Sequence, residues 1–226
     1  MEARKLHEKL AAEFFGSMFL VMAAISSMIL FDSVFESPKG IAVFASAVAV
    51  AFVLCALIEI FAPFSGAHFN PVVTMVILFE KKIILSTAAL FILVQFIGGL
   101  AGTVLSHLMF LDEVGNLFTV SAVQRTSYIY FGEVICTFIL VFAVLLLVKT
   151  KSRKISLIVG FLVGGQFMAT SSTMFANPQV TVARMFTNSA AGIRPSDGLI
   201  FIAMQVIGAL LAYGTYKLFF AKALCD

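Results

Sequence analysis

The stretch that decides the fold is Ser65-Gly66-Ala67-His68-Phe69-Asn70-Pro71-Val72-Val73-Thr74. Its ending recurs 107 residues later, in Met174-Phe175-Ala176-Asn177-Pro178-Gln179-Val180-Thr181, so that both copies read Asn-Pro-x-Val-Thr. Each Asn-Pro opens an apolar run of nine residues, at 71–79 and 178–186. Nine helical residues rise about 13 Å, roughly half of the ~30 Å hydrocarbon core of a bilayer. The sequence therefore predicts two re-entrant half-helices over these runs.

The composition places these runs in a membrane protein. Of the 226 residues, 61% are hydrophobic and 12% are charged, whereas soluble domains average about 45–50% and about 25%. Six segments are apolar over the ~20 residues that a spanning helix needs: 10–31, 41–60, 83–109, 127–148, 155–173 and 198–220. We predict an all-α polytopic membrane protein with six transmembrane helices and two half-helices.

The Lys and Arg residues of the loops predict the orientation. Eleven fall on one side of the predicted spans: Arg4, Lys5, Lys9, Lys81, Lys82, Lys149, Lys151, Arg153, Lys154, Lys217 and Lys222. The other side carries four: Lys39, Arg125, Arg184 and Arg194. Because cytoplasmic loops are enriched in Lys and Arg, we predict a multi-pass protein of the plasma membrane with both termini in the cytoplasm.

The two halves of the chain repeat one another. Glu13 and Glu133 begin matching apolar segments, the Asn-Pro motifs follow, and Gln95-Phe96-Ile97-Gly98 then matches Gln205-Val206-Ile207-Gly208. Three spans per half is an odd number, so the second half is inverted relative to the first. We predict one transmembrane domain over 1–226, with inverted repeats of approximately 1–115 and 120–226, in which the two Asn-Pro helix starts meet near the midplane.

The two Asn-Pro helix starts predict a pore. Proline is favoured at the first position of a helix, and the side-chain carbonyl of Asn70 or Asn177 caps that first turn. Two amide N–H donors on each Asn are then free to hold the oxygen of a passing water or alcohol. The positive ends of the half-helix dipoles repel cations and protons at the same place.

Five further polar residues leave alternatives open. Glu13 and Glu133 either transfer protons or brace the irregular loops by accepting backbone N–H groups. His68 either gates the pore with pH or lines it and braces its loop. Gln95 and Gln205 either contact solute or stabilise helix packing beside the small residues that follow them.

Other function classes find little support in the sequence. Cys, His and carboxylates show no metal-ligand spacing, the three Cys are far apart, and no catalytic triad or phosphate-binding loop can be assembled. We therefore expect no enzyme, no metal, no cofactor and, at a net charge of +3, no nucleic-acid partner. A proton- or ion-coupled secondary transporter is the alternative to a passive channel, because such transporters also use inverted repeats. A purely structural membrane protein would leave the two Asn-Pro starts unexplained.

Four motifs resemble the aquaporin and glycerol-facilitator family, the major intrinsic proteins. They are Ser-Gly-Ala-His-Phe-Asn-Pro at 65–71, Ala-Asn-Pro at 176–178, Ala-Glu-Phe-Phe-Gly at 12–16 and Gln-Phe-Ile-Gly-Gly at 95–99. The resemblance implies a homotetramer in membrane lipid with one pore per subunit. It also implies passive flow of water, and leaves glycerol and other small neutral solutes open.

The sequence departs from the pattern of that family at the motifs themselves. The Asn-Pro-Ala boxes of the family read Asn70-Pro71-Val72 and Asn177-Pro178-Gln179 here. The family usually has Arg three residues after the second Asn, at the narrowest point near the outer mouth, and here that residue is Val180. Arg184, one helical turn further along, either faces the lumen or extends to the membrane interface.

The resemblance also implies the other residues of that narrow point. Spacing from the Asn-Pro motifs assigns it to Val50, Gly165 and Met174. The resemblance thus implies a filter less polar than that of strict water channels. Water conduction follows from the Asn pair, whereas exclusion of glycerol does not.

Overall fold

The computed structural model describes residues 5–221. Arg4 and Lys222 of the charge count, and the ends of the predicted domain, lie outside the described residues. The described chain forms helices and no strand. In order they are α1 (Leu6–Met28), the π-helix η1 (Ile29–Val34), α2 (Lys39–Ser65), α3 (Pro71–Phe79), α4 (Leu85–Met109), α5 (Leu111–Val114), α6 (Ser127–Lys149), α7 (Ile155–Ala169), α8 (Pro178–Arg184) and α9 (Pro195–Phe219).

The predicted spans are present, and one of them is shorter than predicted. The helices α1 with η1, α2, α4, α6 and α9 are long and apolar enough to cross a membrane. The fifth span, predicted over 155–173, ends as α7 at Ala169. Its 15 residues rise about 22 Å, and the helix is capped at Thr170, which is extended and is followed by a turn at 171–172. The protein is therefore an all-α, multi-pass membrane protein, with one short span beside the second motif.

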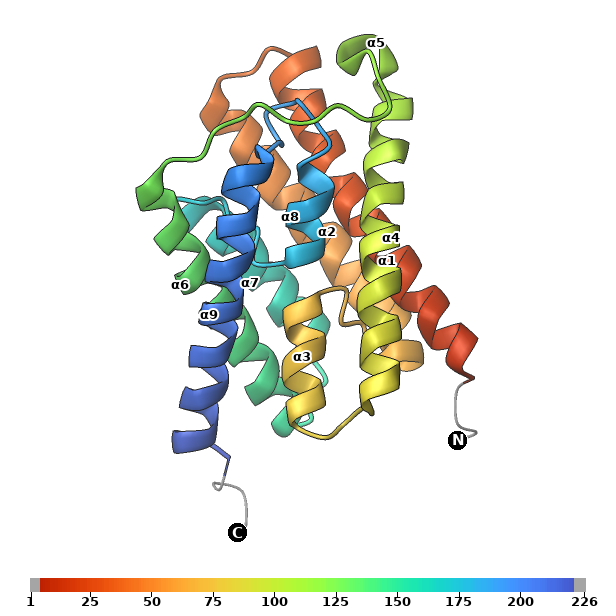
Figure 1. The fold of residues 1–226 in the computed structure, drawn as a ribbon, viewed down its shortest axis with the longest axis vertical. Helices are drawn as coiled ribbons and strands as arrows, with labels where there is room; N and C mark the ends of the chain where they lie inside the picture. The colour runs from red at the N-terminus through yellow and green to blue at the C-terminus, as the bar shows by residue number, and fades with distance from the viewer. Residues whose placement is uncertain (1–4, 222–226) are drawn as a thin grey trace.

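The two half-helices lie at the centre of the bundle. The α3 helix has the predicted bounds, Pro71–Phe79, whereas α8 ends at Arg184, two residues before the predicted end. Figure 1 shows α3 and α8 end to end between the long helices. Both begin with proline at the first helical position. The two N-termini therefore approach each other inside the bundle.

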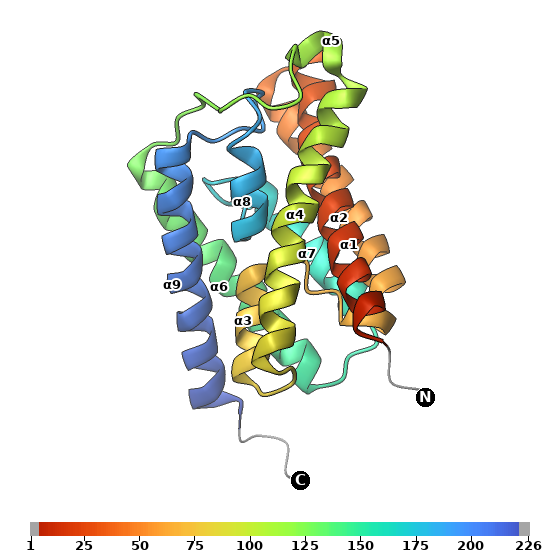
Figure 2. The same ribbon diagram turned by 45° about the vertical axis from the view of Figure 1, so that its right-hand side comes forward.

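Two equivalent helix pairs surround the half-helices, α1 with α4 and α6 with α9, as Figure 2 shows. Glycine makes each close approach possible. A Cβ at Gly98 would overlap the carbonyl oxygen of Phe14, and a Cβ at Gly208 would overlap that of Val134. The same contact at the same place in both halves is what an inverted repeat requires.

The two ends of the described chain lie at one end of the bundle and α5 lies at the other (Figure 1). We call the end of the bundle with the two chain ends the terminal end, and the opposite end the α5 end. An even number of spans has this consequence whichever way the protein is inserted. Which end faces the cytoplasm remains a prediction from the charges.

Candidate functional site

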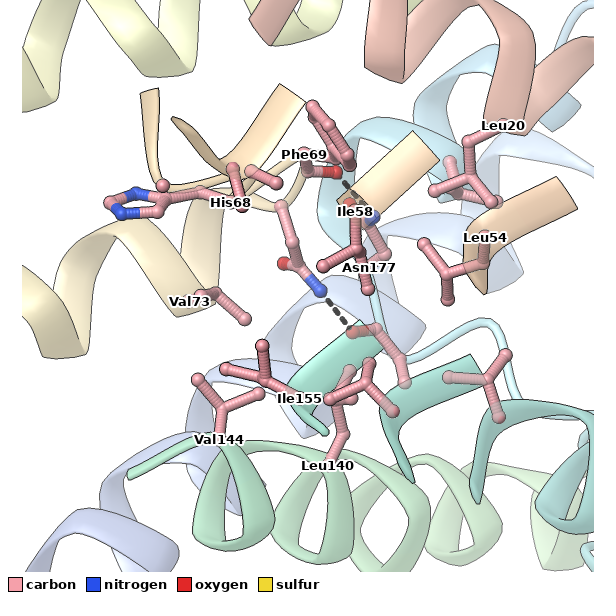
Figure 3. Close-up of a pocket in the computed structure, with 18 of the residues that line it drawn as sticks. Leu20, Leu54, Ile58, His68, Phe69, Val73, Leu140, Val144, Ile155 and Asn177 are labelled. Carbon is pink, nitrogen blue, oxygen red and sulfur yellow. Dashed lines mark hydrogen bonds between the residues drawn. The ribbon is translucent and has the colours of Figure 1, made fainter. Parts of the chain in front are cut away.

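The site is built around two amides that bond across the centre of the bundle. The Asn70 Nδ2 donates to the carbonyl oxygen of Ala176 at 2.8 Å, and the Asn177 Nδ2 donates to that of Phe69 at 2.8 Å. The dashed lines of Figure 3 mark these bonds. The expectation that both donors of each amide are free is therefore wrong. One N–H holds the opposite loop, and the other is left for a solute.

The other end of each amide caps its own half-helix. The Asn70 Oδ1 accepts the backbone N–H of Val72 at 3.1 Å, and the Asn177 Oδ1 accepts that of Gln179 at 3.2 Å. Such caps satisfy one of the unpaired N–H groups of a first helical turn. The cap fixes each side chain, so the remaining N–H has a defined direction.

The loops that lead into the half-helices have unusual backbone conformations at matching positions. Three residues before each Asn, Ala67 and Met174 have φ of 53° and 45°, and directly before each Asn, Phe69 and Ala176 have φ of 46° and 47°. Left-handed conformations of residues other than glycine cost about 1–3 kcal/mol each. Such conformations persist only where surrounding contacts hold the backbone, so these two loops need stabilising contacts.

A fully buried carboxylate holds the first loop. Glu13 accepts the backbone N–H groups of His68 at 2.9 Å and Phe69 at 2.8 Å, and the hydroxyl of Ser65 at 2.6 Å. The Gln95 Nε2 donates to the same carboxylate at 2.7 Å. Glu13 lies outside the lining of the cavity, and its acceptor sites are occupied by the loop.

Glu133 does the same in the second half. It accepts the backbone N–H groups of Phe175 at 3.0 Å and Ala176 at 2.8 Å, and the Nε2 of Gln205 at 2.6 Å. It too is fully buried and lies outside the cavity lining. The contacts of both carboxylates are those of a brace.

The two glutamines link the carboxylates to the half-helices. The Gln95 Nε2 also donates to the Thr74 hydroxyl at 3.0 Å, and the Gln205 Nε2 to the Thr181 hydroxyl at 2.9 Å. Both glutamines have no exposed surface and lie outside the cavity lining. Of the two predicted roles, the geometry matches packing rather than solute contact.

A cavity of about 360 Å³ runs past the two amides. Lys82 and Ile83 line it towards the terminal end and Arg184 towards the α5 end. Aliphatic side chains surround the amides in Figure 3; those in the lining are Leu20, Ala24, Val50, Leu54, Ile58, Ala62, Ala67, Val73, Ile77, Ile83, Leu140, Val144, Val148, Ile155, Val159, Val163, Ala176 and Val180. A water occupies about 30 Å³, so the cavity has room for several.

His68 both lines this cavity and braces its loop. Its Nδ1 lies 3.1 Å from the Thr74 hydroxyl, and its ring packs edge-on against Phe91. His68 lines the cavity, and its contacts with Thr74 and Phe91 fix the position of the ring. Of the predicted roles, lining the lumen and bracing the loop therefore occur together.

At the α5 end the structure corrects one of the predicted filter residues. Val50, Met174 and Val180 line the cavity, and their role as a filter stays a prediction; Gly165 faces outward, and a Cβ added there would meet nothing within 4 Å. The assignment of Gly165 to the filter is wrong because the lumen face of α7 carries Val163 and Phe167. Residues four apart share a helix face, and Gly165 falls between them.

Arg184 lies in the wall and does not extend to lipid. It is 2% exposed, its Nε donates to the carbonyl of Ala191, and its guanidinium carbon lies 3.6 Å from the centre of the Phe175 ring. Of the two predicted positions, the structure has the one beside the lumen. In contrast, Val72 and Gln179 lie outside the wall, and Gln179 contacts the carbonyl of Phe69 at 3.2 Å.

Sequence reasoning missed Phe167 and Arg125. Phe167 lies within the span predicted over 155–173, and no motif distinguishes it there. Spacing from the Asn-Pro motif selects Gly165 instead. The sequence analysis counted Arg125 only as a loop charge, yet its guanidinium lies near Arg184, 5.5 Å from the centre of the same Phe175 ring.

Among residues 5–221, no group of three or more His, Cys, Asp or Glu could hold a metal ion.

The sequence pattern of the major intrinsic protein family matches residues 1–174. The chain belongs to the major intrinsic protein family. Members of this family are transporters rather than enzymes, in agreement with a site that consists of a lined cavity.

Relatives and solved structures within this family extend over nearly the whole chain. The chain is 32% identical to the aquaglyceroporin AqpS of Rhizobium meliloti (strain 1021) over 94% of its own length and 90% of the relative. It is 25% identical to human aquaporin-4 over 92% of its length and 66% of that protein. The X-ray structure of the aquaglyceroporin from Plasmodium falciparum matches with a TM-score of 0.75 at 18% identity, covering 98% of each chain. This last likeness shows the fold.

Proposed function

We propose that this protein is a passive channel for water and for small neutral solutes such as glycerol. The observation that carries the proposal is the pair Asn70 and Asn177, which meet in the wall of one cavity with one amide N–H each to spare. A solute oxygen can accept from both amides in turn. The aquaglyceroporin and aquaporin names of the relatives agree with this class of solute.

The rest of the wall favours passage over binding. Conduction requires that a site be attractive enough for a solute to enter and weak enough for it to leave. The aliphatic side chains offer no hydrogen bonds, so the polar side chains that a solute meets are few: the Asn pair at the centre, Ser65, His68 and Lys82 towards the terminal end and Arg184 towards the α5 end. Binding at the Asn pair is limited to a few neutral hydrogen bonds, which is compatible with rapid exchange.

The half-helices supply the discrimination against cations. The N-termini of α3 and α8 point at the place where the amides meet, and each carries a partial positive charge. A cation, or a proton moving along a water chain, is repelled there. Proton exclusion therefore depends on the same elements as water binding.

The narrow part at the α5 end selects by size. Val50, Phe167, Met174 and Val180 line this part of the cavity with apolar side chains, and Arg184 adds a charge one turn after Val180; in our proposal they form the constriction. A short aliphatic side chain at 180 leaves space that an arginine would fill. Passage of glycerol follows from that space.

A coupled transporter is the second candidate, and the geometry disfavours it. Such a mechanism needs a carboxylate that exchanges protons or ions with the lumen. Glu13 and Glu133 face the loops, hold several N–H groups each and do not line the cavity. Releasing either one would leave the strained loops unsupported.

We further propose that the protein acts in the plasma membrane as a homotetramer, with both termini in the cytoplasm. The charge distribution of the loops supports the orientation, and the family resemblance supports the tetramer. The α5 end is then the outer mouth of the pore.

Stopped-flow light scattering on proteoliposomes tests the proposed function. Purified protein should raise both water and glycerol permeability above those of empty liposomes, with a weak temperature dependence. A glycerol gradient alone should drive the flux. Permeability equal to that of empty liposomes would refute the channel, and water flux without glycerol flux would refute the proposed size selection.

A further inference from the structure

A second cavity of about 260 Å³ lies at the α5 end, and we call it the vestibule. Its lining consists of Met28, Asp32, Lys39, Val43, Val123, Arg125, Phe167, Thr173, Arg184 and Ala190. Phe167 and Arg184 also line the main cavity. The vestibule therefore leads directly to the narrow part of the pore.

The vestibule carries an excess of positive charge. Lys39, Arg125 and Arg184 line it, against a single carboxylate, that of Asp32. Cavities lined by one sign of charge raise the local concentration of the opposite ion. For a pore that passes neutral solutes alone, such an excess has no obvious use.

The two arginines of the vestibule are not engaged in ion pairs. Within residues 5–221, the ion pairs are Arg194 with Asp197 and Lys217 with Glu80. Asp197 lies near Arg125 but outside the vestibule lining, and its oxygens accept from the Arg194 Nε, the Arg125 backbone N–H and the Tyr130 hydroxyl. The Arg125 guanidinium is left without a carboxylate.

The two guanidiniums lie over one aromatic ring, and each has N–H donors without a partner among the described residues. The guanidinium carbons of Arg184 and Arg125 are 3.6 Å and 5.5 Å from the centre of the Phe175 ring. Arg184 uses its Nε on the Ala191 carbonyl, and Arg125 uses one terminal nitrogen on the Gly192 carbonyl at 3.1 Å. The Arg125 Nε is buried and has no hydrogen-bond partner.

Arg184 is buried and Arg125 is half-buried, and two such cations without an ion pair are costly unless a ligand completes the cluster. Burial lowers the pKa of Arg125, whereas the charges of Glu133 and Asp197 raise it, and an arginine side chain remains charged throughout. Guanidinium forks match the two oxygens of a carboxylate or phosphate, forming short, charge-assisted hydrogen bonds. The missing component of this cluster is an oxyanion.

We propose that the vestibule binds one small oxyanion, a carboxylate or phosphate, between Arg125 and Arg184, and that the bound ion blocks the pore. The block follows from position, because Arg184 and Phe167 belong to both cavities. The side chains next to them in the main cavity are the apolar Val50, Val163, Met174 and Val180, so an ion that left the two arginines would lose hydration and gain few partners there. The block rests on the proposed channel function, whereas the binding does not.

Calorimetric titration of the detergent-purified full chain with inorganic phosphate, at constant ionic strength against sodium chloride, tests the binding. We expect saturable binding of one phosphate per chain. Arg125→Gln should weaken it at least about tenfold, because it removes hydrogen bonds to a charged group. Arg153→Gln is the control, because it removes the same charge between α6 and α7, outside the vestibule lining, and it should bind like the unaltered chain.

A second variant, Arg125→Lys, keeps the test decisive if Arg125→Gln fails to fold. Arg125→Lys keeps the charge and loses the fork, and should fold and bind phosphate more weakly. Heat released equally by phosphate and chloride, or equal phosphate affinity in both Arg125 variants and the unaltered chain, would overturn the site.

Proteoliposomes with phosphate on both sides of the bilayer test the block. Water permeability of the unaltered chain should fall saturably with phosphate, and that of Arg125→Gln should not. Phosphate binding without loss of water flow would overturn the block alone. If the unaltered chain conducts no water, the proposed function fails, and the calorimetric titration still decides the site.

Discussion

Under the proposed function, Val180 and Arg184 divide between two residues what one arginine would do at the narrow point. Val180, a residue of the second half-helix α8, lines the cavity with a short apolar side chain, and Arg184 places its charge one turn further along, over Phe175. The proposal therefore sets selection by size and selection by charge at different depths. The family resemblance pointed to this place but not to the stacking on Phe175, which depends on a loop residue brought there by Glu133.

The first prediction at the residue scale concerns Val180. Val180→Arg puts a long, charged side chain into the constriction, so glycerol permeability should fall at least about tenfold while water permeability changes by less than about threefold, the loss reflecting a few kcal/mol of steric cost. Paired stopped-flow measurements on one vesicle preparation give both values. The uncharged Val180→Met separates size from charge, and unchanged glycerol flux in both variants would contradict a filter at 180.

The corrected filter residue gives a second prediction. Phe167→Ala removes a ring shared by the two cavities, so glycerol permeability should rise. Gly165→Ala, two residues away on the outward face, should leave water and glycerol permeability unchanged. The reverse pattern would restore the assignment of Gly165. The assignment of Gly165 came from counting twelve residues back from Asn177, but residues 170–176 are not helical, so that count does not determine which face of α7 a residue occupies.

At the scale of elements, the half-helices depend on buried braces. Each strained loop is held by one carboxylate and one glutamine, which in turn contacts a threonine of the half-helix. The existence and starts of the half-helices were predictable, because Asn-Pro caps are local. The cross-bonds of the amides were not, since they join loops more than 100 residues apart through backbone carbonyls, which carry no sequence signal.

Glu13→Gln tests the brace. His68 and Phe69 donate to different oxygens of Glu13, so the amide keeps an acceptor for one of them and turns its NH₂ towards the other donor; the protein should lose about 2–4 kcal/mol of stability. Unfolding of the detergent-solubilised protein by heat measures the loss. Glu59→Gln is the control, since Glu59 is exposed and accepts a single bond from Ser156, and its effect should stay below about 1 kcal/mol. Equal stability of both variants would argue against the brace and in favour of proton transfer by Glu13.

At the scale of the whole molecule, the inverted repeat explains why one site is built from two ends of the chain. The loops at Phe69 and Ala176 accept each other's amides only because the halves insert in opposite directions. Span number, half-helices and the shared end of the described termini followed from hydropathy and length, which act through the bilayer and not through specific contacts. The short α7 and the vestibule required knowledge of loop paths.

Orientation is tested by cysteine labelling in intact cells. Asp112→Cys, in α5, should react with a membrane-impermeant maleimide, and Arg153→Cys, between α6 and α7, should react only after permeabilisation. The unaltered chain controls for its own cysteines. Labelling of Arg153→Cys in intact cells would invert the proposed topology.

The central claim is that solute passes where Asn70 and Asn177 meet. Val73 lines the cavity beside Asn70, and its side chain points into the pocket in Figure 3. Water permeability of Val73→Cys proteoliposomes, measured before and after a methanethiosulfonate reagent, tests the claim most directly. We predict that modification reduces water flow to the level of empty liposomes, that a thiol reductant restores it, and that the unaltered chain does not respond. Undiminished water flow through protein shown by mass to be modified at residue 73 would contradict the account.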